Sequence, residues 1–465
     1  MVPRSGPTTE PPATRNFLFV DTQDDVSQEY GVGREKMAFL SKLAYQRKKK
    51  DAIARLRWVR QTKNQQTAVA QGAFRVQVAP TAIPFDGARE GSVWAQMSAA
   101  LPAIRYIGLF LAAENKAFLE STRGGSVSTN AKSSREAIPY RIEAIKHLNR
   151  LLQEPLTAGA ESIILCVSTM KHCEALTAQF AALQAHENGL RSLIHLAGGL
   201  ERLGHALLAT IYQGDIATAA LNDSGPCFPM FPRFRREVLD EPAMFSRSNR
   251  NYEYYGRPIP PPVSSFGTRF TKSPWYLKLD ADLKNTFHAW RRLFIHFEMG
   301  TRIPSLVKPT DKDLYIILLH HLLSLRYPAC DNDLNEPLRR TLFIYTYLRI
   351  WNFGGFPVTR VMMKGLKESL IPRLACFQAT APDLLLWILF IGAISSQGHE
   401  SYPWFVGTLR DTAIHLNLPE WDAARAMLVQ FFYSDRPGYI TGADLWNELM
   451  APSQLYIAPG CQIYF

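Results

Sequence analysis

The stretch Leu384-Leu-Leu-Trp-Ile-Leu-Phe-Ile-Gly-Ala-Ile394 is the longest strongly apolar run in the sequence. A helix needs about 20 apolar residues to span a lipid bilayer, and this run is too short to do so. We therefore expect it to form a helix that is buried in a protein core. The N-terminus, Met1-Val-Pro-Arg-Ser-Gly-Pro7, lacks the apolar run of a secretory signal. These features predict a soluble protein without a membrane-bound part.

Helical periodicity extends on both sides of this run. Beyond residue 280, helical patterns fall near 281–298, 311–326, 336–352, 359–369, 383–396, 403–416, 419–432 and 441–450. Before residue 222, they fall at 92–120 (with Pro102 near a turn or kink), 138–153, 157–170, 173–184 and 189–214. Convincing period-two patterns, which are typical of strands, are scarce. The sequence therefore predicts an all-α fold in which short helices stack on one another.

Segment 222–280 has a different character, because Pro226, Pro229 and Pro232 are followed by the run Arg257-Pro-Ile-Pro-Pro-Pro-Val263. Proline continues neither helices nor central strands, so we expect an extended connection here. The predicted organisation is a disordered arm at 1–33, a basic helical segment at 34–63, a linker at 64–90, a first helical half at 91–221, the Pro-rich connection at 222–280, and a second helical half at 281–465.

Positive charge is concentrated in one segment of the chain. The 465 residues carry a net charge of +11, with hydrophobic residues at 47%, which is typical of a globular protein. Between Arg34 and Lys63 there are eleven basic residues opposed only by Glu35 and Asp51, so this segment holds +9 and everything else holds +2. The basicity therefore belongs to an arm and not to the globular body, and it indicates an anionic or receptor partner for that arm.

Three interpretations of the basic arm stay open. Clustered Lys and Arg residues are what nuclear import receptors bind, and they also neutralise nucleic-acid phosphates; the third interpretation is a merely solvated arm. No leucine heptads follow Leu56, which disfavours a basic-region leucine zipper. The residues predicted to contact DNA or an import receptor are Arg47, Lys48, Lys49, Lys50, Arg55, Arg57 and Arg60.

Motifs of catalysis and metal binding are incomplete or absent. The six cysteines are scattered without a C-x-x-C pair, which predicts buried thiols in a reducing compartment and neither a zinc module nor a disulfide framework. Neither His186-Glu187 nor His399-Glu400 is followed by the second histidine of a metallopeptidase helix. His320 and His321 are adjacent, so on a helix their side chains point about 100° apart. We therefore predict no catalytic, cofactor-binding or metal-binding residue and expect a protein that is not an enzyme.

Two blocks of sequence resemble the fungal-specific transcription factor domain, the helical domain that typically follows a Zn2Cys6 cluster. The first block comprises His186-Glu-Asn-Gly-Leu190, Ser192-Leu193, Gly198-Gly-Leu200, Leu203-Gly204, Ile211, Asp215, Ala219 and Pro226-Cys-Phe-Pro229. The second comprises Leu385-Leu-Trp-Ile-Leu-Phe-Ile-Gly392, Trp404-Phe-Val406, Trp421 and Phe431-Phe-Tyr-Ser-Asp435. Tyr433 stands where the family pattern leads us to expect tryptophan. The resemblance covers roughly residues 90–450, and Phe17-Leu-Phe-Val20 before a basic segment is similar to family members without the cluster.

The resemblance implies a nuclear regulator of metabolic or secondary-metabolite genes. The cysteines of the binuclear cluster, with C-x2-C-x6-C spacing, are missing, so zinc-dependent reading of the major groove does not carry over. We therefore expect a regulator that acts through partners, and direct DNA binding by the basic arm is the alternative. The expected partners are other transcription factors or co-regulators, an import receptor, DNA, and a second copy of the chain.

A helical small-molecule-binding protein or enzyme is the remaining hypothesis. It rests on aromatic-rich helices that contain Trp290, Trp351, Trp387 and Trp404. Packing of these rings in a core explains them equally simply, and it is the interpretation that we favour.

Overall fold

The apolar run forms the most deeply buried helix of the second half. In the computed structural model it is part of α16 (Pro382–Ser395), which has proline in its first turn and ends at the Ser396 cap. Side chains from Leu384 to Ala393 are at most 3% exposed, because α13, α14, α15, α17 and α18 surround them. The prediction of a buried helix is confirmed. The structure describes residues 100–123, 135–153, 156–239, 253–254, 257–261, 263–302, 313–327, 333–349, 356–434 and 441–451.

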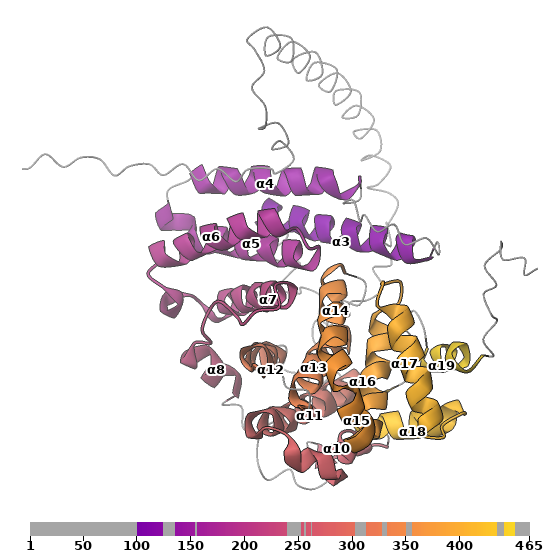
Figure 1. Ribbon diagram of the computed structural model, residues 1–465. Helices are drawn as coiled ribbons and strands as arrows, with labels where there is room; N and C mark the ends of the chain where they lie inside the picture. Colours follow the sequence, from indigo (N-terminus) through magenta and orange to yellow (C-terminus); the bar gives the residue numbers. More distant parts are fainter. Residues whose placement is uncertain are drawn as a thin grey trace, which may run out of the picture. The chain divides into compact units, whose positions relative to one another are not determined.

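The fold is all-α, as the periodicity predicts (Figure 1). The first half consists of α3 (Pro102–Arg123), α4 (Ala137–Gln153), α5 (Leu156–Leu176), α6 (Phe180–Leu196), the 3-10 turn η2 (Leu200–Arg202) and α7 (His205–Leu221). The second half consists of α11 (Ala281–Arg302), α12 (Asp313–Ser324), α13 (Asn335–Arg349), α14 (Val358–Leu370), η6 (Ile371–Arg373), α15 (Leu374–Thr380), α16, α17 (Tyr402–His415), α18 (Trp421–Phe431) and α19 (Gly442–Met450).

The helix boundaries between residues 157 and 214 differ from those predicted. The predicted breaks near 171 and 186 lie inside α5 and α6, and the predicted helix 189–214 is divided in two. The chain turns instead at Ala178, which has φ 56°, and at Gly198 and Gly199, which have φ 90° and 97°. Glycine adopts such left-handed backbone angles without steric cost, so Gly198-Gly199 ends α6. Lys171, His186 and Glu187, which lie at the predicted breaks, are buried within continuous helices.

Segment 222–280 contributes to the core in addition to connecting the halves. Its described residues include α8 (Pro232–Leu239), the two-residue antiparallel strands β1 (Glu253–Tyr254) and β2 (Arg257–Pro258), and the short turns η3 (Val263–Ser265), α10 (Thr268–Lys272) and η4 (Pro274–Lys278). Phe234, Phe266 and Phe270 are fully buried. The expected extended connection is therefore partly helical, because its aromatic side chains are buried: Phe234 packs against Tyr212 of α7, and Phe270 packs against Trp387 of α16.

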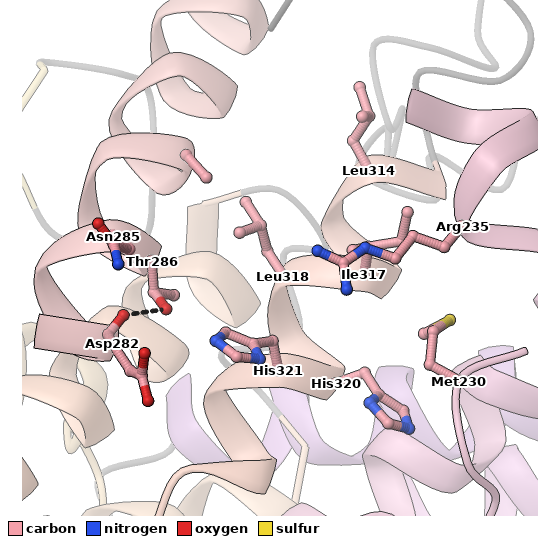
Figure 2. A pocket seen from close by; sticks show the side chains of 11 residues that line it. Met230, Arg235, Asp282, Asn285, Thr286, Leu314, Ile317, Leu318, His320 and His321 are labelled. Atoms are coloured by element: carbon pink, nitrogen blue, oxygen red, sulfur yellow. Dashed lines mark hydrogen bonds between the residues drawn. The ribbon is translucent and has the colours of Figure 1, made fainter. Parts of the chain in front are cut away.

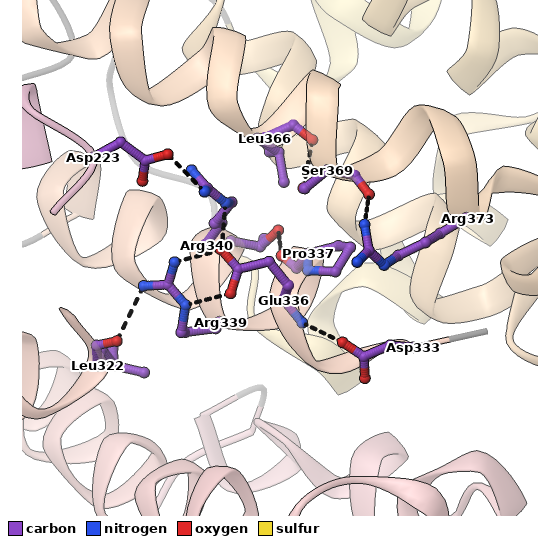
Figure 3. A network of polar contacts seen from close by, with 11 residues as sticks. Asp223, Leu322, Asp333, Glu336, Pro337, Arg339, Arg340, Leu366, Ser369 and Arg373 are labelled. Carbon is purple, nitrogen blue, oxygen red and sulfur yellow. Dashed lines mark hydrogen bonds and ion pairs between the residues drawn. The ribbon is translucent and has the colours of Figure 1, made fainter. Parts of the chain in front are cut away.

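The two helical halves pack against each other through α7, which contacts α12 and α14. A polar network reinforces this contact (Figure 3). Arg340 on α13 pairs with Asp223 after α7 at 2.8 Å and with Glu336 at 2.7 Å. Arg339, which is 2% exposed, also pairs with Glu336 and donates to the Leu322 carbonyl at 3.0 Å. Every charge in this network has a partner, as burial requires.

None of the described helices combines the length and the apolarity that crossing a membrane demands.

Candidate functional site

The basic residues predicted to bind DNA or an import receptor lie outside the described residues. The same holds for Trp351 and for the arm and linker before residue 91. The described candidate sites lie in the helical body, which also holds the two sequence blocks.

The first sequence block forms a buried cluster of charges at the junction of α5, α6 and α7. We call Lys171, Glu187 and Asp215 the charge cluster. The Lys171 side chain is fully buried, and its ammonium forms an ion pair with the Glu187 carboxylate and lies 3.8 Å from Asp215 Oδ1. Two carboxylates against one ammonium leave a net negative charge, and Arg191 adds a positive charge 3.1 Å from Glu187 Oε1. The cluster is thereby close to neutral.

Asp215 explains why an aspartate in α7 and the Pro-Cys-Phe-Pro run occur together in this block. Its Oδ2 accepts hydrogen bonds from the backbone amides of Cys227 and Phe228, each at 2.8 Å. The ring of Phe228 in turn lies under the Lys171 ammonium, 5.4 Å from ring centroid to nitrogen. The carboxylate therefore fastens the loop after α7 to the charge cluster by charge-assisted hydrogen bonds and a cation–π contact.

A second pair of acid and base residues continues the charge cluster along α5 and α6. Glu174, which is fully buried, contacts His186 Nδ1 with one oxygen and Arg141 of α4 at 3.2 Å with the other. His186 and Glu187 are thus adjacent in sequence but bond to different partners on α5. The pair that resembles half of a zinc-binding motif serves here to hold α4, α5 and α6 together.

Burial and ion pairing shift the pKa values of the two carboxyl groups of the charge cluster in opposite directions. Burial alone would raise the pKa of Glu187, but attraction and hydrogen bonding from Lys171, with help from Cys227 and Arg191, lower it overall. Burial raises the pKa of Asp215 more than Lys171 and the two backbone amides lower it. Glu187 is therefore the principal anionic partner of Lys171.

Glu187, Asp215 and Cys227 bring three potential metal-ligand atoms within 4.8 Å of one another. The Lys171 ammonium already supplies positive charge to both carboxylates. Burial, followed by the hydrogen bond to Glu187 and its negative charge, raises the pKa of the Cys227 thiol to about 12. A thiol that holds its proton is a poor metal ligand and a poor nucleophile. The chemistry of this donor set therefore favours a structural role over metal binding or covalent catalysis.

The second sequence block forms an aromatic cluster around Phe432. The rings within 6.4 Å of Phe432 belong to Phe266, Phe270, Phe287, Trp290, Phe294, Tyr345 and Trp387. The indole of Trp387 donates to the Phe432 carbonyl at 3.2 Å, and that of Trp290 donates to Thr346 Oγ1 at 2.8 Å. Both tryptophans are fully buried, which agrees with the core-packing interpretation of their helices.

Tyr433, where the resemblance led us to expect tryptophan, still fills an aromatic position. Its ring contacts Phe390 at 5.3 Å and Trp421 at 5.6 Å, both edge to face. The edge-to-face geometry is one that aromatic pairs prefer. The departure from the family pattern therefore leaves the packing of this block intact.

A pocket of about 350 Å³ opens between α8, α11 and α12 (Figure 2). Leu314, Ile317 and Leu318 of α12 form its apolar floor. His320 and His321 both line it but have separate environments, since His320 Nε2 is bonded to the Phe228 carbonyl at 2.9 Å while His321 is exposed. The sequence analysis missed this pocket, because its walls come from three elements whose packing no local pattern reveals.

A search of protein-family models, of curated proteins and of solved structures finds no match to this chain.

Proposed function

We propose that the protein is a nuclear regulator of transcription that acts through partners and does not read DNA sequence by itself. The observation that carries this proposal is the separation of charge along the chain. A 30-residue arm holds +9 of the net charge of +11, residues 1–33 hold −3, and residues 91–465 hold +5. An arm of this kind suits an import receptor or an anionic surface, whereas a helical body in which +5 is spread over 375 residues suits protein contacts.

The resemblance to the fungal-specific transcription factor domain supports the same proposal. Its two blocks occupy different parts of the body and have different chemistry, one built on the charge cluster and one on the aromatic cluster. The regulated genes would be those of a metabolic or secondary-metabolite pathway, as the resemblance implies.

The experiment that tests this proposal places the full chain at a promoter. The chain is fused to a heterologous DNA-binding module and expressed with a reporter that carries the matching sites, and its unfused form is followed by fluorescence. We expect nuclear accumulation of the unfused chain and a change of at least threefold in reporter output. A chain that stays cytoplasmic under all growth conditions and leaves the reporter unchanged when tethered would refute the proposal.

Direct DNA binding by the arm is the second candidate, and the density of Arg47, Lys48, Lys49 and Lys50 favours it. Each phosphate contact contributes a slope of about −0.9 to the dependence of log affinity on log salt concentration. Changing these four residues to alanine would then weaken DNA binding by the full chain and flatten its salt dependence. If the parent chain has no affinity for DNA at low salt, this second candidate fails.

A further inference from the structure

The pocket between α8, α11 and α12 combines an apolar floor with charges of opposite sign on facing walls. Arg235 projects from α8 over the floor, while Asp282 and Asn285 lie on α11 (Figure 2). His321 lies on α12 between these two walls, and the charges of both Arg235 and Asp282 act on its ring. Partial burial of the ring, and then Arg235, lower the pKa of His321, while Asp282 opposes them. His321 is therefore neutral at pH 7 and offers one hydrogen-bond donor and one acceptor.

Four polar side chains of this pocket are exposed to solvent, and no neighbouring side chain in the described part of the protein holds them. Within the part of the chain that the structure describes, the side chains of Arg235, Asp282, Asn285 and His321 make no hydrogen bond or ion pair. Less exposed charges elsewhere in the body form ion pairs, as Arg340 does with Asp223 and Glu336 (Figure 3). Convergence of several unpaired polar groups on an apolar floor is what small-molecule sites have in common.

The arrangement also selects the kind of ligand. A monoanion would leave Asp282 without a partner and close to a like charge, and a monocation would do the same to Arg235. A molecule with a cationic end, an apolar middle and an anionic end satisfies both walls and covers Leu314 and Leu318. A volume of about 350 Å³ suits a small molecule and lies at the lower end of the usual range of ligand pockets.

We propose that this pocket binds a small zwitterion with an apolar middle, with its amine on Asp282 and its carboxylate on Arg235. The inference goes beyond the proposed function and does not depend on it, because it concerns binding by the purified chain. Asn285 and His321 supply further hydrogen bonds to the two ends, and Ala289 keeps the α11 wall clear of bulk.

The test uses three series of probes that share their carbon chains. The full chain is titrated with ω-amino acids of four, six and eight carbons, and with the carboxylic acids and primary amines of the same lengths, by ligand-observed NMR. We expect the best ω-amino acid to bind at least fivefold more tightly than either monofunctional probe of its length. Equal affinity across the three series, or no binding of any probe at concentrations on the order of 10 mM, would overturn the proposal.

Charge variants locate the binding in this pocket. Arg235→Glu should weaken binding of the ω-amino acid at least fivefold and strengthen binding of the amine, and Asp282→Asn should reduce the ω-amino acid to the level of the carboxylic acid. Arg236→Glu and Asp411→Asn are matched controls, because both residues are exposed and neither lines the pocket. Binding that changes equally in the controls and the pocket variants would contradict the assignment, and circular dichroism would confirm that all four variants are folded.

Discussion

The charge cluster and the aromatic cluster are both buried, and both lie in sequence blocks that resemble the same domain, yet they are stabilised in different ways. Around Lys171, each charged group depends on a particular partner from another helix. Around Phe432, many rings share a core, and the indoles of Trp290 and Trp387 donate hydrogen bonds within it. Packing of this kind spreads its stabilisation over many weak contacts, whereas buried ions concentrate it in a few strong ones. The two regions should therefore respond differently to substitution and to pH.

The largest loss of stability is expected from Lys171→Met, which removes the buried cation and leaves Glu187 with Arg191 and Asp215 with two backbone amides as partners. Breaking a buried ion pair by removing one partner costs about 3–5 kcal/mol, and we expect a loss of that size in the free energy of unfolding. Chemical denaturation of the full chain measures it. Lys146→Met is the matched control, because Lys146 forms an exposed pair with Glu143, and such pairs contribute about 0–1 kcal/mol.

Adding Glu187→Gln to Lys171→Met should restore part of the lost stability, since it removes the carboxylate that has lost its buried ammonium partner. The coupling between the two substitutions isolates the ion pair from the rest of the cluster. A Lys171→Met variant as stable as Lys146→Met, or a double variant no better than the single one, would show that the cluster is not held by charge.

Acid sensitivity should arise more from buried histidines than from the two carboxylates of the charge cluster. Burial, and then the charge of Lys171, lower the pKa of the neighbouring His172 on α5 from 6.5 to about 4. Glu187, with its lowered pKa, loses stability as pH falls, whereas Asp215, with its raised pKa, loses stability as pH rises, so the two effects oppose each other. His399, in the turn between α16 and α17, is 6% exposed, and burial, with a contribution from Arg360, lowers its pKa from 6.5 to about 4.

The lowered pKa of His399 determines the direction in which protein stability changes with pH. The unfolded chain binds a proton below about pH 6.5 and the folded chain does not, so stability is lost as pH falls from about 6.5 to about 4. At 1.36 kcal/mol per unit, this loss is about 3 kcal/mol over the window. His399→Gln should remove its own share of this loss and leave the share that His172 contributes over the same window, as measured by denaturation at several pH values. An unchanged profile would place the acid sensitivity elsewhere.

A moderate loss of stability is expected where α16 packs against α17 in the second sequence block. A Cβ added at Gly392 of α16 would overlap the ring of Phe405 on α17, which is fully buried and has no room to move. Overpacking of this kind costs about 1–3 kcal/mol, so Gly392→Ala should lower the melting temperature of the chain. A variant that melts at the parent temperature would mean that the two helices do not approach this closely.

The smallest change in stability, and the only predicted gain, is expected at Gly407 on α17. A Cβ at Gly407 of α17 meets nothing within 4 Å, and glycine in a helix interior is about 0.5–1 kcal/mol less favourable than alanine. Gly407→Ala should therefore stabilise the chain by about that amount in the same melting assay. A destabilised Gly407→Ala variant would show that the exposed face of α17 is in contact with something else.

The two regions also differ in how much of them could be predicted from the sequence. The run from Leu384 to Ile394 is apolar on every side, so its burial could be predicted from composition alone. Lys171 and Glu174 are charged residues of a type that is usually exposed, and no sequence pattern predicted their burial. Their burial depends on partners from α4, α6 and α7, which lie far apart in sequence. The pocket beside His321 escaped prediction for the same reason.

The central claim, that the protein acts on transcription through partners, is tested most directly by chromatin occupancy. The tagged full chain is compared with a variant in which Arg47, Lys48, Lys49 and Lys50 are alanine and a heterologous import signal restores equal nuclear levels. Recruitment by partners predicts that both chains occupy the same chromosomal sites to the same extent. Loss of occupancy in the variant, at equal nuclear concentration, would contradict the claim and show that the basic arm itself holds the protein on DNA.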